Sequence, residues 1–412
     1  MLQEEFMNLS GVRRTLEFGI YRDGDNNLDR SQAVTLAQAL EVSAENRNIE
    51  FTVEDTTSRN SDSLETRAYR LADGEVRDAK EEPAHDMASA RNLARFVART
   101  LDDAERCNAR QTWIELSDHG AGDGGGLEAD SAKAIMSIDS MAAAISEGVR
   151  MHAQAHPEDA PRRVDGVVAN QCLMASLGFA DELSHAGVRF LAASPETMIS
   201  PGTPTTVASA IANHTDDPNA MAASVVRNVM HFTYEAGLER WHPAAAFDVL
   251  DLDANKWACV EQNIKAFNDA LESESPAHVD VVRQDARKTE GMVRFPDSNG
   301  MPWRADRPAI TLYTAFANDG RLDSDLRLKA KAAAGAIATA VLAHAESRDV
   351  APFGDADYRD AVGPTVHFPV RANEVDPWAP RVSETNNAFY RRVDGEEVAN
   401  ATAARFEGKS DG

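Results

Sequence analysis

The sequence predicts an α/β protein with a mostly parallel sheet flanked by helices. Short apolar runs typical of buried strands alternate with longer segments whose apolar residues recur at helical spacing. Alternation of this kind gives a parallel sheet covered by helices on both faces. The chain has 412 residues, of which 43% are hydrophobic, so it can bury a large core. We divide it into a lead (1–14), a core (15–215), and a mixed C-terminal part (216–412) that completes the sheet and adds helices.

In the first half, the predicted strands and helices follow one another along the chain. The run 16–21 reads LEFGIY and is followed by the turn-forming residues RDGDNNLD, which indicates a strand that ends there. The helix at 139–153 is indicated by apolar residues three and four positions apart. The predicted strands cover 16–21, 49–55, 66–71, 111–117, 164–169 and 188–194. The predicted helices cover 30–43, 87–103, 139–153 and 173–185. The segment 56–63 and the glycine-rich stretch 121–130 (AGDGGGLEAD) are predicted to be loops.

The second half is predicted to be richer in helix. The segment 324–347 is rich in alanine and has strong helix propensity. Apolar runs at 244–252 and 365–370 are typical of strands, whereas 290–325 carries few periodic apolar residues. The predicted helices cover 204–237, 254–272 and 324–347, the predicted strands 244–252 and 365–370, and the predicted loop 290–325.

Charge and composition exclude several classes of protein. The chain has 42 basic and 67 acidic residues and a net charge of −25, which disfavours binding to nucleic acids or anionic membranes. No run of eighteen apolar residues predicts a membrane span, and acidic residues stand where a signal peptide needs basic ones. We therefore expect a cytoplasmic protein. Three cysteines without a CxxC pair predict neither a disulfide framework nor a zinc ribbon.

One cysteine and one histidine follow directly on predicted strands. His119 comes after the strand 111–117, and Cys172 after the strand 164–169. Because ligands of such sheets bind beyond the carboxyl ends of the strands, we expect both side chains at one edge. A cysteine between a strand and the next helix gains from the helix dipole, and Gly120 would let a backbone N–H approach a substrate carbonyl. The pattern favours nucleophilic catalysis by a thiol with a histidine that handles protons.

These motifs, in this order, resemble the clostripain family of cysteine peptidases, which have a caspase-like fold. DHG after one strand and CLM about fifty residues later carry the resemblance, together with an N-terminal GDNNL. Further segments agree with the family from about residue 15 to residue 370 of this chain. They are YRDGDNNLD at 21–29, SIDSMAAAI at 137–145, ASPE at 193–196 and GPTVHFP at 363–369.

The resemblance implies a role for each matching residue. Cys172 would be the nucleophile, and His119 would be the acid–base group that protonates the leaving amine. The backbone N–H groups of Gly120 and Cys172 would form the oxyanion hole. The family works with a Cys–His dyad, so no third carboxylate and no cofactor for the chemistry are expected, and residues 15–215 would be the caspase-like catalytic core.

The sequence departs from the family two residues before the cysteine. The family has an aspartate there that binds a substrate Arg or Lys, and this chain has Asn170. Loss of a charge-assisted bond would cost about 1.5–3 kcal/mol for a basic side chain. The preference for cleavage after Arg or Lys is therefore open, and a small or polar side chain is the competing substrate. Glu196 could supply a replacement charge.

The resemblance also suggests points of regulation. Family members are often activated by cleavage between the catalytic residues, and Lys133 is our first choice of self-cleavage point if a basic preference is kept. Calcium is suggested by the family, and the acidic turn contains Asp23 and Asp25, although a structural role of that turn is favoured. The expected partners are a protein or peptide substrate and a regulatory protein.

Three hypotheses from different classes remain. The first is a cysteine endopeptidase, with a regulated intracellular role by analogy with caspases. The second is a catalytically silent relative that binds peptides or partner proteins. The third is a Cys–His amidase that acts on small amides.

Overall fold

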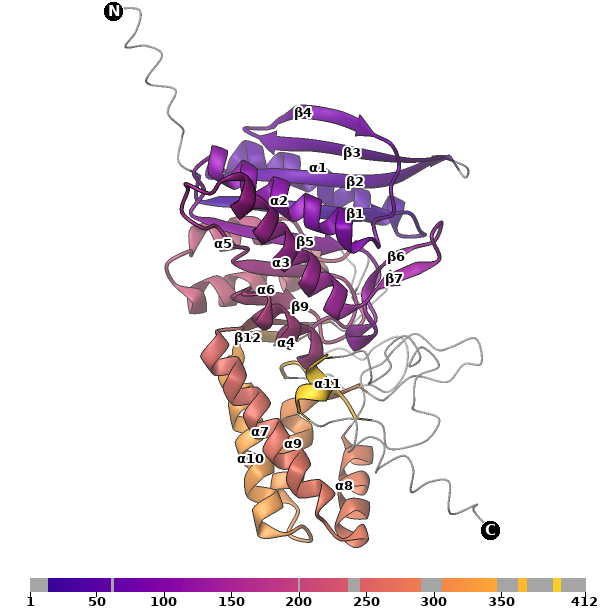
Figure 1. Cartoon of the computed structure of the whole chain (residues 1–412), viewed down its shortest axis with the longest axis vertical. Coiled ribbons are helices and arrows are strands. Elements are labelled where there is room, and N and C mark those ends of the chain that lie inside the picture. Colours follow the sequence, from indigo (N-terminus) through magenta and orange to yellow (C-terminus); the bar gives the residue numbers. More distant parts are fainter. Residues whose placement is uncertain are drawn as a thin grey trace, which may run out of the picture.

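A computed structural model shows a nine-stranded sheet with helices on both faces and a helical lobe at one end (Figure 1). It describes residues 14–60, 63–198, 201–235, 245–289, 306–346, 362–368 and 388–393. The predicted lead therefore lies outside the described residues except for Arg14.

The centre of the sheet is parallel and its two sides are antiparallel. The strand order is β12-β10-β9-β8-β5-β1-β2-β3-β4. The five strands from β9 to β2 run parallel, whereas β3 and β4 at one side and β10 and β12 at the other are antiparallel. The strands are β1 (Leu16–Gly24), β2 (Ile49–Asn60), β3 (Ser63–Ala72), β4 (Glu75–Glu82), β5 (Gln111–Ser117), β8 (Gly166–Asn170), β9 (Phe190–Ala193), β10 (Ala246–Asp251) and β12 (Val341–Glu346).

Each face of the sheet packs against three helices. Alternate residues of one strand supply the two cores, as the pleat requires: Trp113 of β5 belongs to one core, and Ile114 belongs to the other. One face is covered by α2 (Ala90–Arg106), α3 (Ile138–Ala155) and α4 (Leu177–His185). The other face is covered by α1 (Asp29–Glu45), α5 (Val207–Asn213) and α6 (Pro218–Glu235).

The helical lobe continues the first of these two cores. Its apolar residues, such as Trp257, Ile264 and Phe316, form one cluster with those under α2, α3 and α4. The lobe contains α7 (Ala254–Glu272), α8 (Pro276–Lys288), α9 (Ala309–Asn318) and α10 (Ser324–Ala340), and α11 (Ala388–Arg392) lies between it and the sheet (Figure 1). Two small sheets pair β6 (Gly126–Ala129) with β7 (Ala134–Met136) and β11 (Asp306–Pro308) with β13 (Thr365–His367).

Two loop predictions in the first half are wrong. Of the predicted loop 56–63, residues 56–60 continue β2 and Ser63 begins β3, because the two strands pair as a long hairpin. The glycine-rich stretch after His119 is not a simple loop, since it holds the β6–β7 hairpin. Strand pairing satisfies the backbone hydrogen bonds of these polar segments. They carry no apolar pattern from which the strands could be predicted.

The helix predicted at 324–347 ends at Ala340, seven residues early. Residues 341–346 form β12, which pairs antiparallel with β10, and His344 Nδ1 lies 2.8 Å from Asp248 Oδ1 of that strand. Helix propensity is a weak preference that tertiary pairing overrides at this sheet edge.

Other predictions in the second half are partly right. The segment 204–237 contains two helices, α5 and α6, rather than one. The strand predicted at 365–370 exists as β13, but it pairs with β11 outside the main sheet. Residues 306–325 hold a strand and a helix instead of a loop, and 290–305 lie outside the described residues.

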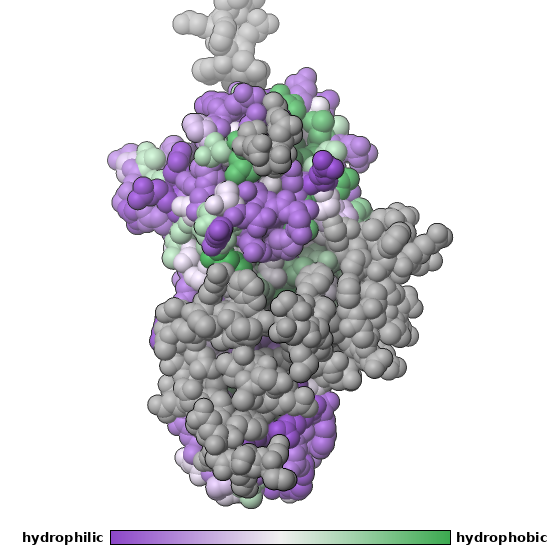
Figure 2. Space-filling model, turned by 90° about the vertical axis from the view of Figure 1, so that its right-hand side faces the viewer, coloured by the Kyte–Doolittle hydropathy of each residue, from purple (hydrophilic) through white to green (hydrophobic). Residues whose placement is uncertain are grey.

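The described residues on the face drawn in Figure 2 are mostly hydrophilic, in keeping with the high charge content of the sequence. Among the described helices, none has the length and apolar character needed to cross a membrane.

We expect Gly166→Ala to destabilise the fold. A Cβ at this position would lie 2.5 Å from ring atoms of Trp113, which is fully buried and stacks on Phe190. Overpacking of this kind costs about 1–3 kcal/mol, which urea unfolding would measure. The matched control is Gly335→Ala in α10, where a Cβ meets nothing within 4 Å and should stabilise the protein by up to about 1 kcal/mol. Equal stability of both variants would contradict this account.

Candidate active site

The pairing of β5 with β8 brings His119 and Cys172 to one edge of the sheet. Ser117 and Asn170, the last residues of these parallel strands, are partners in the register. Beyond them, the backbone N–H of Asp118 donates a hydrogen bond of 3.3 Å to the carbonyl oxygen of Asn170. The shared edge that the sequence predicts is therefore present.

Gly120 contacts the backbone of Cys172. A Cβ added at Gly120 would lie 2.3 Å from the carbonyl oxygen of Cys172 and 3.0 Å from its nitrogen. Only glycine allows this approach. The two residues predicted to form an oxyanion hole are thus in van der Waals contact through their backbones.

The Cys172 thiol is uncharged in the resting site. Its sulfur accepts a hydrogen bond of 3.2 Å from the backbone N–H of Met198. Desolvation, with smaller contributions from the carboxylates of Glu196 and Asp118, raises the pKa of the thiol to about 11. The expectation that Cys172 begins a helix is wrong, because α4 starts only at Leu177 and Cys172 lies in the preceding turn. It therefore lacks the direct help of a helix dipole.

The His119 imidazole is held by the turn after β1. Its Nε2 lies 2.7 Å from Oδ1 of Asn27, which can only accept a hydrogen bond, so the Nε2–H tautomer is favoured. Burial lowers the pKa of His119, with Glu128 and Asp130 acting in the opposite direction. The imidazole is thus neutral near pH 7, and its Nδ1 is the nitrogen that can accept a proton.

The same turn fixes the residue before the histidine. Asn26 Nδ2 donates to Asp118 Oδ1 (2.5 Å) and to the carbonyl oxygen of Glu128 (2.9 Å). Asp118 is buried, and its Oδ2 accepts the backbone N–H of Glu128. Burial and the neighbouring Asp23 raise the pKa of Asp118. Asn26 and Asn27 together position the Asp118–His119 segment.

The acidic turn supports the β6–β7 hairpin. Asp23 is fully buried, its Oδ1 accepts the N–H of Asp25, and desolvation raises its pKa to about 7. Asp25 Oδ2 accepts the N–H of Ser131 at 3.1 Å, and the carbonyl oxygen of Asp25 accepts the N–H of Asp130. Neither Asp23 nor Asp25 belongs to a group of converging potential metal ligands in the described part of the chain. These contacts favour the structural role of the turn.

Asn170 is buried, and its amide is fully engaged. Its Nδ2 donates to Glu115 Oε1 (3.1 Å) and Ser117 Oγ (3.0 Å), and its Oδ1 accepts the N–H of Thr203 (2.7 Å). Gly202, which has a φ of +97°, lies against the same oxygen. In this conformation both Nδ2 hydrogens of Asn170 are already donated within the protein, so the amide has no N–H left for a substrate side chain.

Glu115 is a buried acid next to Asn170 that the sequence reasoning missed. Its side chain is fully buried, and desolvation raises its pKa to about 7 against the opposing hydrogen bond from Asn170. Its Oε2 has no hydrogen-bond partner among the described residues. A charged residue inside a predicted buried strand was the available signal.

Glu196 and Gln171 lie close to the cysteine. Glu196 is buried, its carbonyl oxygen accepts the N–H of Leu173, and its Oε2 accepts the N–H of Thr197. Gln171 Nε2 donates to the carbonyl oxygen of His119 (2.9 Å) and so connects the segments that carry Cys172 and His119. The sequence analysis predicts a role in substrate binding for Glu196 and none for Gln171.

A helix near the C-terminus contacts the loop that follows His119. The hydroxyl of Tyr390, on α11, donates to Asp123 Oδ2 (2.6 Å) and accepts the N–H of His367 (3.0 Å). Arg392 of the same helix pairs with Asp181 and Glu182 of α4. No sequence signal links residues so far apart, and neither Asp123 nor Tyr390 was singled out.

Comparisons with known proteins identify the fold. No family model and no curated protein matches the sequence. The chain is similar to a secreted C11 cysteine protease of Bacteroides thetaiotaomicron in complex with an irreversible peptide inhibitor, with a TM-score of 0.64 and 14% identity over 93% of this chain and 99% of that one. It is also similar to an inactive zymogen C11 protease of Parabacteroides distasonis, with a TM-score of 0.62 and 15% identity over the same shares. The chain has the fold of C11, clostripain-family proteases, as the sequence resemblance implies.

We expect Asn27→Asp to raise the pKa of His119. A carboxylate in place of the Asn27 amide would stabilise the imidazolium form, because Oδ1 lies 2.7 Å from Nε2. An NMR pH titration of the His119 ring protons should show the midpoint move to higher pH. His119→Gln assigns the His119 resonances by removing them, and His278→Asn in α8 is a control that should leave the His119 midpoint unchanged. An unchanged midpoint would mean that Asn27 does not hold the ring in solution.

Proposed function

We propose that this protein is a cysteine peptidase in which Cys172 is the nucleophile and His119 the acid–base group. The observation that carries the proposal is the contact of Gly120 with the Cys172 backbone at the edge where His119 is held by Asn27. The likeness in fold to C11 cysteine proteases supports it. A peptide or protein is the proposed substrate.

The proposed reaction starts from a neutral pair. As Cys172 Sγ attacks the scissile carbonyl carbon, its proton passes to the His119 imidazole, because the raised pKa of the thiol prevents a stable thiolate beforehand. The N–H groups of Gly120 and Cys172 stabilise the oxyanion. His119 then protonates the leaving amine, and water hydrolyses the acyl-enzyme to release the acid and restore the thiol.

A silent state is the second candidate, because a specific observation favours it. Cys172 Sγ accepts a hydrogen bond from the backbone N–H of Met198, and the His119 ring is hydrogen-bonded to Asn27. A chain fixed in this arrangement would bind peptides without cleaving them. In an active protein, the side chains of Cys172 and His119 would rotate toward each other when substrate binds. In a silent protein they would stay as they are.

The first prediction from this proposal concerns the dyad. Cys172→Ala and His119→Ala should each reduce peptide cleavage by at least about a thousandfold, since each removes a reacting group, while thermal unfolding stays near wild type. A peptide with an electrophilic warhead should label Cys172 and no other cysteine. Cys259→Ala is the matched control and should keep full activity, because Cys259 is exposed on α7. Turnover within tenfold of wild type in either dyad variant, or an unlabelled Cys172, would sink the peptidase proposal.

For specificity, we propose that Glu115 replaces the missing charge at position 170. Its carboxyl lies against the Asn170 amide, 3.1 Å away, on β5, beside the strand β8 that ends two residues before Cys172. A buried negative charge under the pocket floor would attract a basic side chain before the scissile bond. With a pKa near 7, Glu115 would be neutral at pH 6 and largely ionised at pH 8.

The second prediction tests this charge through selectivity. The Arg:Gln ratio of kcat/KM should rise between pH 6 and pH 8 in the wild type and stay flat in Glu115→Gln. Because titration of Cys172 and His119 changes kcat/KM equally for the Arg and the Gln peptide, it cancels in this ratio. Glu147→Gln, on the exposed face of α3, changes the net charge equally and should leave the ratio unaltered. Identical profiles in Glu115→Gln and wild type would remove Glu115 from the account of specificity while leaving the dyad untouched.

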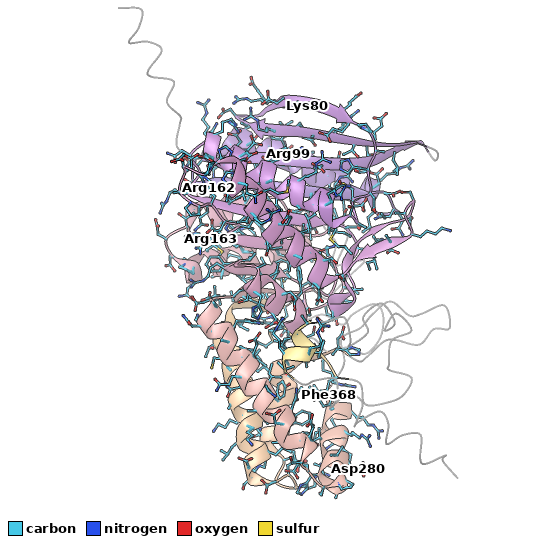
Figure 3. All side chains as sticks on the ribbon, in the orientation of Figure 1. Lys80, Arg99, Arg162, Arg163, Asp280 and Phe368 are labelled. Carbon is cyan, nitrogen blue, oxygen red and sulfur yellow. The ribbon has the colours of Figure 1, made fainter. Side chains whose placement is uncertain are left out.

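Self-processing at Lys133 remains part of this proposal. Lys133 is exposed at the turn of the β6–β7 hairpin and has a φ of +50°. Arg162 and Arg163 lie at the opposite side of the sheet from this hairpin (Figures 1 and 3). Cleavage at Lys133 requires the basic preference that Glu115 would provide.

Calcium dependence, a regulatory partner and an intracellular role also remain proposals from the family resemblance.

A further inference from the structure

A cluster of two histidines and two carboxylates joins α2 to α3, away from the active site. It consists of Asp102, Glu105, His152 and His156, which we call the α2–α3 histidine cluster. The helix α2 ends shortly before β5 begins, and α3 ends before β8 begins. The cluster therefore lies near the amino ends of the two strands whose carboxyl ends carry His119 and Cys172.

Three atoms of the cluster converge on one point. Asp102 Oδ1 lies 2.7 Å from His152 Nδ1 and 3.2 Å from His156 Nε2, and the three atoms all lie within 4.8 Å of one another. Bonds of about 2.0–2.1 Å in a tetrahedral zinc site place neighbouring ligand atoms about 3.3 Å apart. The spacing of the two histidines, four residues apart on one helix, puts both rings on one face.

Glu105 faces the other nitrogen of each ring. Its Oε2 is 3.4 Å from His152 Nε2 and 3.6 Å from His156 Nδ1. This buried oxygen has no hydrogen-bond partner among the described residues, although its carboxylate needs one. Histidines that bind a metal usually direct their second N–H to a carboxylate, which fixes the tautomer. Glu105 occupies the place of that orienting group for both rings.

The charge of the cluster is not balanced by a basic side chain. Within the described ranges, Asp102, Glu105 and the adjacent Asp159 pair with histidines and with no Lys or Arg. Two other groups of potential ligands differ in this respect. Arg392 already contacts the group of Asp181, His185 and Glu261, and three arginines contact Glu50 in the group with Glu17 and Cys107. Among the described residues, the α2–α3 histidine cluster and the group of Glu105, His156 and Asp159 that overlaps it lack such a cation.

We propose that the α2–α3 histidine cluster binds Zn²⁺ through Asp102 Oδ1, His152 Nδ1 and His156 Nε2. Glu105 orients both imidazoles, and the fourth position is open to water because Asp102 and His156 are partly exposed. His152, only 2% exposed, anchors the site in the packed interface between the helices. The ion stabilises the contact of α2 with α3 and takes no part in the chemistry at Cys172.

Zinc titration of a protein without accessible thiols tests this site. The full chain with Cys172→Ala and Cys259→Ser, which leaves only the buried Cys107, is titrated with ZnCl₂ by calorimetry at pH 7.5. We expect one equivalent to bind and the thermal unfolding temperature to rise with zinc and not with magnesium. Asp102→Asn and His156→Asn should each weaken binding by about tenfold or more, and Glu105→Gln by less. These residues are partly exposed, so the variants should fold; His152 is left unchanged.

The controls distinguish this site from binding elsewhere. His185→Gln alters the second group of potential ligands, and His278→Gln alters an exposed histidine paired with a glutamate on α8; both should bind zinc like the parent. Co²⁺ in place of zinc should give the intense visible absorption of a four-coordinate ion. The proposal is overturned if the parent binds no zinc or if His156→Asn binds zinc as tightly as the parent. It is also overturned if the unfolding temperature changes with pH but not with zinc. None of these outcomes bears on the peptidase proposal, which concerns the other edge of the sheet.

Discussion

The parallel pairing of β5 with β8 is the constraint on which the rest of the site depends. Because Ser117 and Asn170 are partners in the register, the segments that follow both strands leave the sheet at the same height. The contact of Gly120 with Cys172 then leaves no space for a side chain at position 120. A slip of one residue would turn every side chain of β8 to the opposite face and move Val168 out of its core. The apolar cores on the two faces of the sheet thus determine the register, and the register determines how close the segments with His119 and Cys172 lie.

The acidic surroundings of the cysteine decide how a reaction at this edge can begin. Desolvation and the nearby Glu196 and Asp118 oppose a thiolate, and burial opposes an imidazolium at His119. A preformed ion pair between the two groups would therefore be disfavoured from both sides. Proton transfer that accompanies attack avoids both charged forms, because the negative charge passes directly to the substrate oxygen beside the Gly120 and Cys172 N–H groups. The same surroundings keep the free thiol poorly reactive when no substrate is present.

The sequence predicts the central sheet and the shared edge of His119 and Cys172 well, because both leave a local signal. Strands such as 111–117 are apolar runs ended by a turn, and the order of DHG and CLM along the chain points to one edge. The hairpin of β6 and β7 has no such signal, since its polar residues form strands only by pairing. Val341–Glu346 was predicted as helix because alanine-rich propensity is local, whereas the pairing with β10 that makes it a strand is not. Glu115, Asn27 and Tyr390 act through partners up to 267 positions away, which no spacing rule can reveal.

The two ends of the central strands serve different purposes, and long-range contacts connect them. At the amino ends, α2 and α3 approach each other through paired histidines and carboxylates that stiffen the layer without reaching the substrate edge. At the carboxyl ends, the loop after Gly120 is held by Tyr390 through the buried Asp123, so its position depends on how α11 packs against α4. Loss of the Tyr390 hydroxyl would leave a buried carboxylate without its donor, and such groups move to find water. The loop next to Gly120 is therefore coupled to the C-terminal part of the chain, and the geometry of the candidate site depends on both halves of the sequence.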